Sequence, residues 1–200
     1  GIRCADIEHE AVSSWCQSDL SCGLDGGVAC QAPGATALQL ANSETGILQQ
    51  LPDGLALCDM TQAFGKLPVA FHWSGATMAL VSAHKIGGPK GVGALIVKRG
   101  TEVAAQIKGG GQEMGRRSGT ENVIGIAGFG AAAEAAQRDL ADGVWEQVEK
   151  LRNILEKTLA SDAKGTIFVG YDLDRLPNTS CFVTPGWKGE TQVMQMDLAG

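Results

Sequence analysis

The sequence lacks long hydrophobic runs, clustered basic residues and the cysteine patterns of metal sites. No run of about 18 consecutive apolar residues occurs, so we expect no membrane span, and no signal peptide is visible. The net charge of −6 argues against a nucleic-acid-binding surface, because such a surface needs clustered Lys and Arg. These absences leave a globular protein, whose 44% hydrophobic and 19% charged content supports a buried core.

Cysteine occurs six times, but in no pattern that is typical of a metal site. No CxxC pair is present, and no Cys/His spacing resembles that of a zinc site, so we expect no metal. The chain is also too long and too poor in cysteine for a disulfide scaffold. We therefore interpret all six as reduced thiols of a cytoplasmic protein. They are Cys4, Cys16, Cys22, Cys30, Cys58 and Cys181.

Several short apolar runs predict buried strands. They lie at residues 36–41, 55–58, 76–81 and 92–98. Because these runs do not alternate with polar residues, they favour a sheet covered on both faces, as in an α/β protein with a mostly parallel sheet. Polar residues gather where the runs end, and in open α/β sheets ligands bind at those carboxyl ends.

The remaining pattern predicts helices and two short strands. The helices are expected at residues 10–16, 62–67, 122–138, 144–159, with Asp142 as N-cap, and 190–198; the strands are expected at 166–170 and 179–183. A Gly-rich polar loop covers residues 109–120. The chain begins at Gly1 without Met and stops at Gly200 directly after a helical pattern, so we expect it to be a piece of a longer protein.

Two ionisable residues stand at the ends of apolar runs. Lys85 follows the run at 76–81 almost directly, and Asp59 closes the run at 55–58. A lysine at the mouth of a sheet can be partly desolvated, which lowers its pKa and favours the neutral amine that imine chemistry needs. A carboxylate in such a place can face a cationic ring. Taken singly, each is better explained by a plainer interpretation, Lys85 as a surface lysine and Asp59 as a turn aspartate.

Other polar residues flank the same strand ends. Ser82 and His84 lie beside Lys85 and could donate to a phosphate, while Gln62 lies one turn past Asp59. Each alone is an ordinary polar loop residue. Only their joint pattern favours a ligand site.

Together, four separated motifs, one of them made of two stretches, resemble the cysteine desulfurase family of fold-type-I pyridoxal-phosphate (PLP) enzymes, which are class-V aminotransferase-like. They are Ile7–His9, Ala41–Gly46 (ANSETG), Asp59–Gln62 with Ser82–Gly93 (SAHKIGGPKGVG), and Gly109–Thr120 (GGGQEMGRRSGT). Their order and most of their spacings agree with the family over nearly the whole chain.

The resemblance implies a role for each residue of this pattern. Lys85 is expected to form the Schiff base with PLP and to act as acid and base. Asp59 would pair with the pyridine nitrogen and Gln62 with the phenolic oxygen. Ser82 and His84 would bind the phosphate.

Further residues follow from the same resemblance. His9 would stack on the ring as a second catalytic residue; taken alone, it is better explained as a structural residue at a helix start. Asn42 and Ser43 would contact cofactor or substrate. Thr120 would reach the phosphate in the partner subunit of a homodimer, or cap the following helix, or both. Arg117 is expected to order its loop rather than touch substrate.

The implied activity is PLP-dependent removal of sulfur from L-cysteine, giving L-alanine and a persulfide on an enzyme cysteine. The sulfur would pass to an acceptor or scaffold protein for iron–sulfur cluster or thiolation pathways. A related PLP lyase or aminotransferase, such as a selenocysteine lyase, and a non-catalytic module that retains the fold stay open as alternatives. A dinucleotide-binding protein is disfavoured, because the order strand, GxGxxG, helix, acidic residue is absent.

The chain also departs from the family. Ser43 replaces the usual Asn, which weakens that contact or transfers it to Asn42. Only 12 residues separate Gly46 from Asp59, where relatives place a full helix, so we expect a minimal or irregular connection. The family's nucleophilic cysteine and substrate-binding arginine would lie beyond residue 200, so we expect this chain alone to be inactive. Residues 1–138 would form the large PLP-binding domain without its N-terminal part, and residues 139–200 a linking helix with a truncated small α+β domain.

Overall fold

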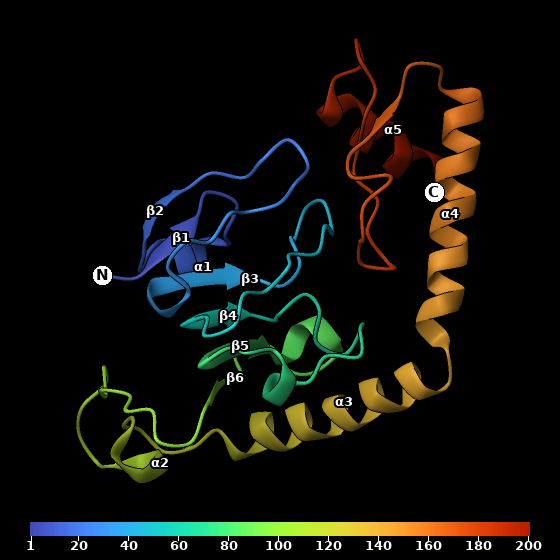
Figure 1. Ribbon diagram of the computed structural model, residues 1–200. Helices are drawn as coiled ribbons and strands as arrows, with labels where there is room; N and C mark the ends of the chain where they lie inside the picture. Colours follow the sequence, from blue (N-terminus) through green and yellow to red (C-terminus); the bar gives the residue numbers. More distant parts are fainter.

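A computed structural model describes every residue of the chain, from Gly1 to Gly200, and its centre is a six-stranded sheet in the order β2-β1-β3-β4-β5-β6 (Figure 1). The strands are β1 (Arg3–Ala5), β2 (Gln17–Leu20), β3 (Thr36–Gln39), β4 (Leu57–Asp59), β5 (Met78–Ser82) and β6 (Gly93–Val97). Neighbouring strands pair in parallel, except β5 and β6, which are antiparallel. The prediction of an α/β chain with a mostly parallel sheet is confirmed.

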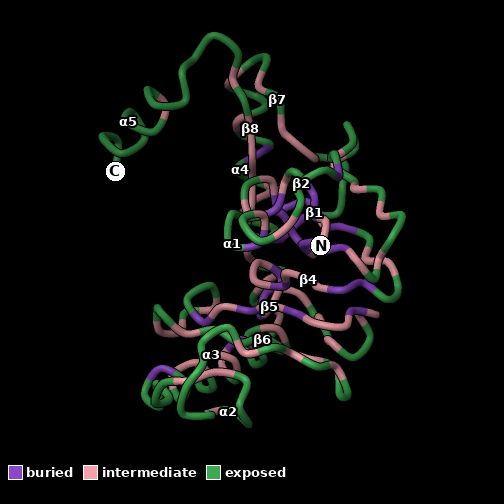
Figure 2. The backbone as a smooth tube through the Cα atoms, turned by 90° about the vertical axis from the view of Figure 1, so that its left-hand side faces the viewer, coloured by how far each residue is buried: buried purple, intermediate pink, exposed green.

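The core follows the central strands, and Figure 2 shows the buried backbone concentrated there. Every residue of β3 is buried, as a continuous apolar run predicts for a central parallel strand. The residues of the main hydrophobic cluster lie in or next to the five strands β1 to β5. The cluster comprises Ala5, Leu20, Leu38, Leu55, Cys58, Met60, Ala76, Ala79 and Val81.

The first two strands were not predicted. β1 has only three residues, and three of the four residues of β2 are exposed, so neither forms an apolar run. Between them lies α1 (Glu10–Ser13), which is shorter than the helix expected over residues 10–16. An edge strand that faces solvent is therefore nearly invisible in hydrophobic patterning.

The helix expected over residues 62–67 is wrong. This segment forms consecutive turns, with an isolated bridge between Phe64 and Leu67. The reason is Gly65, whose φ of 75° lies in the left-handed region that a right-handed helix does not use. Gln62 and Lys66 both lie in these turns, which follow β4 in the chain.

Two long helices, α3 (Val123–Ala141) and α4 (Val144–Asp162), run along one end and one side of the sheet (Figure 1). The prediction of Asp142 as the N-cap of α4 is wrong. Asp142 is the C-cap of α3, and the N-cap of α4 is Gly143 at φ 71°. A left-handed residue ends α3 and turns the chain directly into α4, which leaves no extended position for an Asp cap.

The connections between the parallel strands contain little regular structure. Between β2 and β3 lies only the 3₁₀ turn η1 (Pro33–Ala35), and between β3 and β4 there is no helix at all. Ala41 and Leu48 form an isolated bridge within the latter connection. The expectation of an irregular segment between Gly46 and Asp59 is confirmed.

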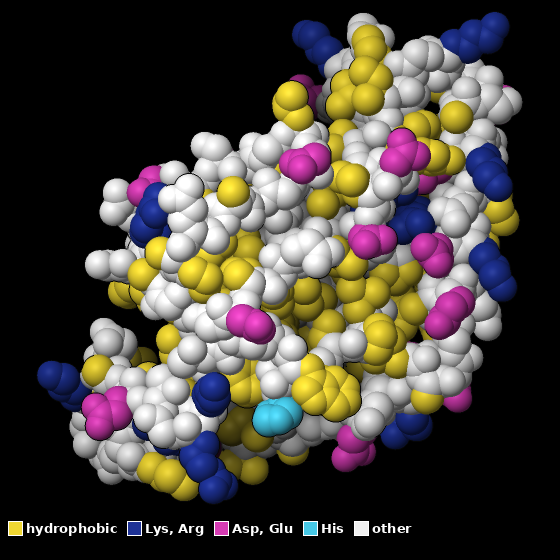
Figure 3. Space-filling model, viewed as in Figure 1, with side chains coloured by type: hydrophobic (Ala, Val, Ile, Leu, Met, Phe, Trp, Pro, Cys, Tyr) yellow, Lys and Arg dark blue, Asp and Glu magenta, His cyan; other side chains and the backbone are white.

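The C-terminal part contains a small antiparallel pair, β7 (Ile167–Phe168) and β8 (Phe182–Val183), and the helix α5 (Gly189–Ala199). Both strands are shorter than expected, and Cys181 lies just before β8, half-buried rather than within a buried strand. Figure 3 shows hydrophobic side chains gathered on the surface between the central strands and α4. None of the helices combines the length and the apolar character needed to cross a membrane.

Candidate active site

The carboxyl ends of β3, β4 and β5 meet at one edge of the sheet. Gln39 pairs with Asp59, and Asp59 pairs with Leu80, so the ends of the three strands lie side by side. A cavity of about 350 Å³ opens there. It is lined by His9, Ala11, Gln39, Ala41, Ser43, Asp59, Thr61, Gln62, Leu80, Ser82, His84 and Lys85. Seven of the nine residues singled out from the sequence therefore lie around one cavity.

Lys85 reaches the cavity from η3 (Ala83–Ile86), a 3₁₀ turn that follows β5 without a break. Gly87, at φ 79°, ends this turn, and Gly88 N–H donates to Ala83 O at 2.9 Å. Lys85 is exposed, so the partial burial expected for its amine is not seen in this chain. The turn places an accessible primary amine at the end of the central sheet.

Ser82 and His84 are joined by a hydrogen bond between their side chains. Ser82 Oγ and His84 Nδ1 lie 2.8 Å apart. Ser82 is the last residue of β5, and His84 is on the same turn as Lys85, so both positions are set by the strand end. A hydroxyl and an imidazole in contact provide neighbouring donors for an anionic group.

Asp59 and His9 each accept a hydrogen bond from the backbone N–H two residues further along the chain. Asp59 Oδ1 accepts from Thr61 N–H at 2.9 Å, and His9 Nδ1 accepts from Ala11 N–H at 3.1 Å as the N-cap of α1. An imidazole that accepts at Nδ1 carries its proton on Nε2 when neutral. His9 is thus a structural cap and a residue of the cavity wall at once.

Sequence reasoning missed two buried charged residues next to these. Glu8 Oε1 accepts from Gln39 N–H at 2.8 Å, while its Oε2 has no partner. Burial, together with the charge of Asp59, raises the pKa of Glu8 to about 7. Lys66 is 7% exposed, and its Nζ donates to Gln62 Oε1 at 3.0 Å. In the sequence, the only signal for these residues is that Glu8 directly precedes His9 and that Lys66 follows Gln62 by four residues.

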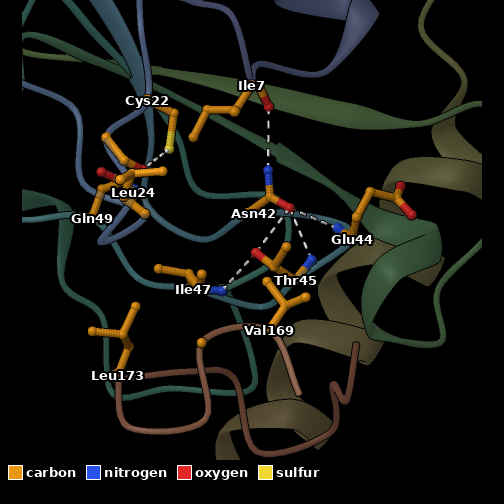
Figure 4. A pocket seen from close by; sticks show the side chains of 13 residues that line it. Ile7, Cys22, Leu24, Asn42, Glu44, Thr45, Ile47, Gln49, Val169 and Leu173 are labelled. Atoms are coloured by element: carbon orange, nitrogen blue, oxygen red, sulfur yellow. Dashed lines mark hydrogen bonds between the residues drawn. The ribbon is translucent and has the colours of Figure 1, made fainter. Parts of the chain in front are cut away.

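The structure places Asn42 outside this cavity, in the wall of a second one of about 440 Å³ (Figure 4). Its Oδ1 accepts from Glu44 N–H and Thr45 N–H, both at 2.9 Å, and its Nδ2 donates to Ile7 O at 3.3 Å. Asn42 therefore shapes its own turn. Ser43, the departure from the family pattern, is the residue of this pair that lines the first cavity.

Thr120 lies apart from both cavities and is exposed. Its interpretation as a helix cap is wrong, because Asn122 is the N-cap of α3 and its Oδ1 accepts from Gly125 N–H at 3.1 Å. Arg117 donates to Glu113 Oε1 at 2.9 Å, and to Ser118 O and Gly119 O. Arg117 thus orders the Gly-rich loop, as predicted, and that loop contains the short helix α2 (Gln112–Gly115).

None of the six cysteines lines the first cavity, and all six are free. Burial raises the pKa of the Cys4 thiol to about 11 and raises that of Cys58 further. Cys22, in the second cavity, has its pKa raised by burial and by nearby aspartates. No group of three His, Cys, Asp or Glu residues is arranged to hold a metal ion.

Comparison with known proteins agrees with this geometry. The family described as aminotransferase class-V matches residues 32–199. The chain is 40% identical over 174 residues to a cysteine desulfurase of Cereibacter sphaeroides, covering 82% of the chain and 44% of that protein. It is 37% identical over 169 residues to a cysteine desulfurase of Klebsiella pneumoniae, covering 80% of the chain and 42% of that protein. The chain thus spans less than half the length of these curated relatives.

Solved structures show the same fold. A NifS-like protein from Rickettsia africae superposes with a TM-score of 0.89 at 29% identity, covering 98% of the chain and 61% of that structure. A second NifS-like protein gives a TM-score of 0.86 at 28% identity, covering 100% of the chain and 61% of that structure. The fold is that of the PLP-binding α/β domain of fold-type-I transferases.

Proposed function

Since the chain belongs to the aminotransferase class-V family, we propose that it is the cofactor-binding part of a PLP-dependent cysteine desulfurase. The substrate would be L-cysteine, and the products would be L-alanine and a sulfur atom carried on an enzyme cysteine. The observation that carries the proposal is the single cavity around which Lys85, Asp59, Ser82 and His84 lie.

The chemistry of the cavity wall fits PLP. An accessible amine, a carboxylate at a strand end and a hydroxyl–imidazole pair surround about 350 Å³, a volume within the usual range of small-ligand sites. Lys85 would hold the cofactor covalently, and Asp59 would hold a proton on its ring nitrogen. When bound, PLP supplies an electron sink for negative charge that develops on the substrate.

The other residues would orient the cofactor. Gln62 would donate to the phenolic oxygen, and Ser82 with His84 would bind the phosphate. His9, held by its contact with Ala11 N–H, would lie against the ring. Lys85 Nζ would then take a proton from the substrate α carbon and return one, because it is the amine on the cavity wall.

Two further residues, which do not line the cavity, also belong to the proposal. Asn42 would act through the turn that carries Ser43, since its own side chain is bonded within that turn. Thr120 would bind the phosphate in the partner subunit of a homodimer, which its exposure on the Gly-rich loop permits.

We further propose the division into a large domain, residues 1–138, and a linking helix with part of a small domain, residues 139–200. Six free cysteines fit a reducing compartment such as the cytoplasm. The sulfur would pass to an acceptor or scaffold protein in iron–sulfur cluster assembly or thiolation.

The experiment loads the chain with PLP and titrates it with L-cysteine while the visible absorption band is followed. We expect L-cysteine to change the band and D-cysteine to leave it unchanged. Formation of pyridoxamine phosphate and a keto acid would instead indicate an aminotransferase. A band that no amino acid alters would indicate a non-catalytic module and contradict the proposal.

A further inference from the structure

Lys66 is a buried lysine without a carboxylate partner. It is 7% exposed, and it takes part in none of the ion pairs of the chain. Its Nζ donates to Gln62 Oε1 at 3.0 Å. Burial and the positive charge of Lys85 both lower the pKa of Lys66. A buried polar group needs a hydrogen-bond partner, and Gln62 Oε1 is the acceptor that the chain gives the Lys66 amine.

The turn that carries Lys66 is held firmly. A Cβ at Gly65 would lie 2.7 Å from Ile86 Cγ2 and 2.9 Å from Ala136 Cβ, so the turn is wedged between the Lys85 segment and α3. Gly65 O also accepts from Trp145 Nε1 of α4 at 2.8 Å. The backbone next to Lys66 is therefore held by contacts with three separate elements.

Lys66 also determines the orientation of the Gln62 amide. An ammonium group only donates hydrogen bonds, so the atom of Gln62 that faces Lys66 must be the oxygen. The Gln62 NH₂ group has no acceptor within the protein, and Gln62 lines the cavity. The amide thus keeps its two donors for whatever occupies the cavity.

We propose that Lys66 is a positioning residue for this site, which holds the Gln62 amide by its oxygen so that the NH₂ group donates to an anionic oxygen of the cofactor. The proposal rests on the proposed function, since PLP supplies that oxygen as its phenolate.

A pH titration of the lysine-bound cofactor tests this. A hydrogen bond to the phenolate oxygen makes this oxygen a poorer acceptor for the proton on the nitrogen that joins Lys85 to the cofactor. Loss of the hydrogen bond therefore raises the pH at the midpoint of the change in the visible band. We expect Lys66→Met, loaded with PLP, to raise this midpoint by about one pH unit. Gln62→Ala should shift it in the same direction, and the exposed Lys98→Met is the matched control.

The other titratable groups on the cavity wall are His9 before α1, Asp59 at the end of β4, and His84 beside Lys85. Glu8 lies close enough to Asp59 for the two charges to interact. All of them stay in every variant, so a difference in midpoint is assigned to the substituted residue. Circular dichroism and thermal unfolding check that each variant is folded.

The double variant decides whether Lys66 acts through Gln62. We expect Lys66→Met to add little to the midpoint once Gln62 is Ala. A Lys66→Met midpoint equal to that of the wild type, or a shift that persists in full without Gln62, overturns the proposal. Should Lys66→Met not fold, Lys66→Leu removes the same charge and donor and is read in the same way. A wild-type chain that forms no visible band with PLP would remove the proposed function as well.

Discussion

Arg175 and Glu156 form a bidentate ion pair, with Nη1 2.9 Å from Oε1 and Nη2 3.1 Å from Oε2. Their side chains are 2% and 1% exposed. Arg175 also bridges to Ile47, and its neighbours Asp174 and Leu176 exchange backbone hydrogen bonds with Leu48 and Gly46. The pair therefore fastens α4 to the turn that follows Ser43 on the wall of the candidate site.

Arg175→Met should destabilise the chain by about 3–5 kcal/mol at neutral pH, because it leaves the Glu156 carboxylate buried without its partner. Urea denaturation measures the free energy of unfolding of the variant and of the wild type. The exposed pair Arg3–Asp19 supplies the control, since Arg3→Met should cost no more than about 1 kcal/mol. Equal effects of the two substitutions would contradict the role assigned to the buried pair.

Acid should remove the contribution of Glu156. Burial alone would raise its pKa, but the hydrogen bonds from Arg175 and Ser180 outweigh burial and hold the pKa below its ordinary value of 4.5. Stability is therefore present above pH 4.5 and falls as the pH drops toward the lowered value. The difference in unfolding free energy between wild type and Glu156→Gln should change across this window and stay constant above it.

Glu8 should show the opposite dependence. Its pKa is raised to about 7 from 4.5, so the folded chain keeps its proton where the unfolded chain has lost it. The stabilisation is complete below pH 4.5 and is lost as the pH rises to about 7. Glu8→Gln keeps an acceptor for Gln39 N–H, so we expect it to equal the wild type near pH 4 and to exceed it by about 3 kcal/mol at pH 8. Parallel stability profiles would show that Glu8 titrates normally.

Asp59 should be needed for carbanion chemistry and dispensable for binding. Asp59→Asn keeps an acceptor for Thr61 N–H but removes the charge. With PLP bound, exchange of the α proton of L-alanine in D₂O should fall by at least about 100-fold, because the ring nitrogen loses its proton partner. Retained cofactor absorbance shows that binding is intact. An exchange rate equal to that of the wild type would mean that Asp59 only shapes its turn.

The chain by itself should not release sulfur from L-cysteine. None of its cysteines lines the cavity, and burial raises the pKa of Cys4, Cys16, Cys22 and Cys58, which disfavours the attacking thiolate. With PLP and no added thiol, we expect alanine formation no greater than in Lys85→Ala. Alanine well above that control would mean that one of the six thiols reaches the substrate.

The sequence was informative where burial creates an apolar run. β3 and β5 were predictable for that reason, and the polar residues that follow them, such as Ser82 and His84, indeed meet at one edge. The exposed edge strand β2 left no such signal. The turn at Gly65 was read as a helix, because apolar spacing does not reveal a positive φ.

Glu8 and Lys66 were missed for a different reason. Charged side chains are usually exposed, and nothing in a single sequence says that these two are buried. Their burial depends on contacts made across the fold, such as Glu8 with Gln39 and the wedge of Ile86 and Ala136 around Gly65. The burial of these two charged residues can therefore be recognised only from the structure, which shows the residues around them.

The most direct test of the central claim, that Lys85 carries PLP, is borohydride reduction of the PLP-loaded chain followed by peptide mapping. We expect a single pyridoxyl label on Lys85, and no label at this position in Lys85→Ala. Lys66 is the alternative lysine to check for the label, because it is a second amine close enough to Lys85 for the charge of Lys85 to lower its pKa. A label on Lys66 or any other lysine, or no label at all, would contradict the claim.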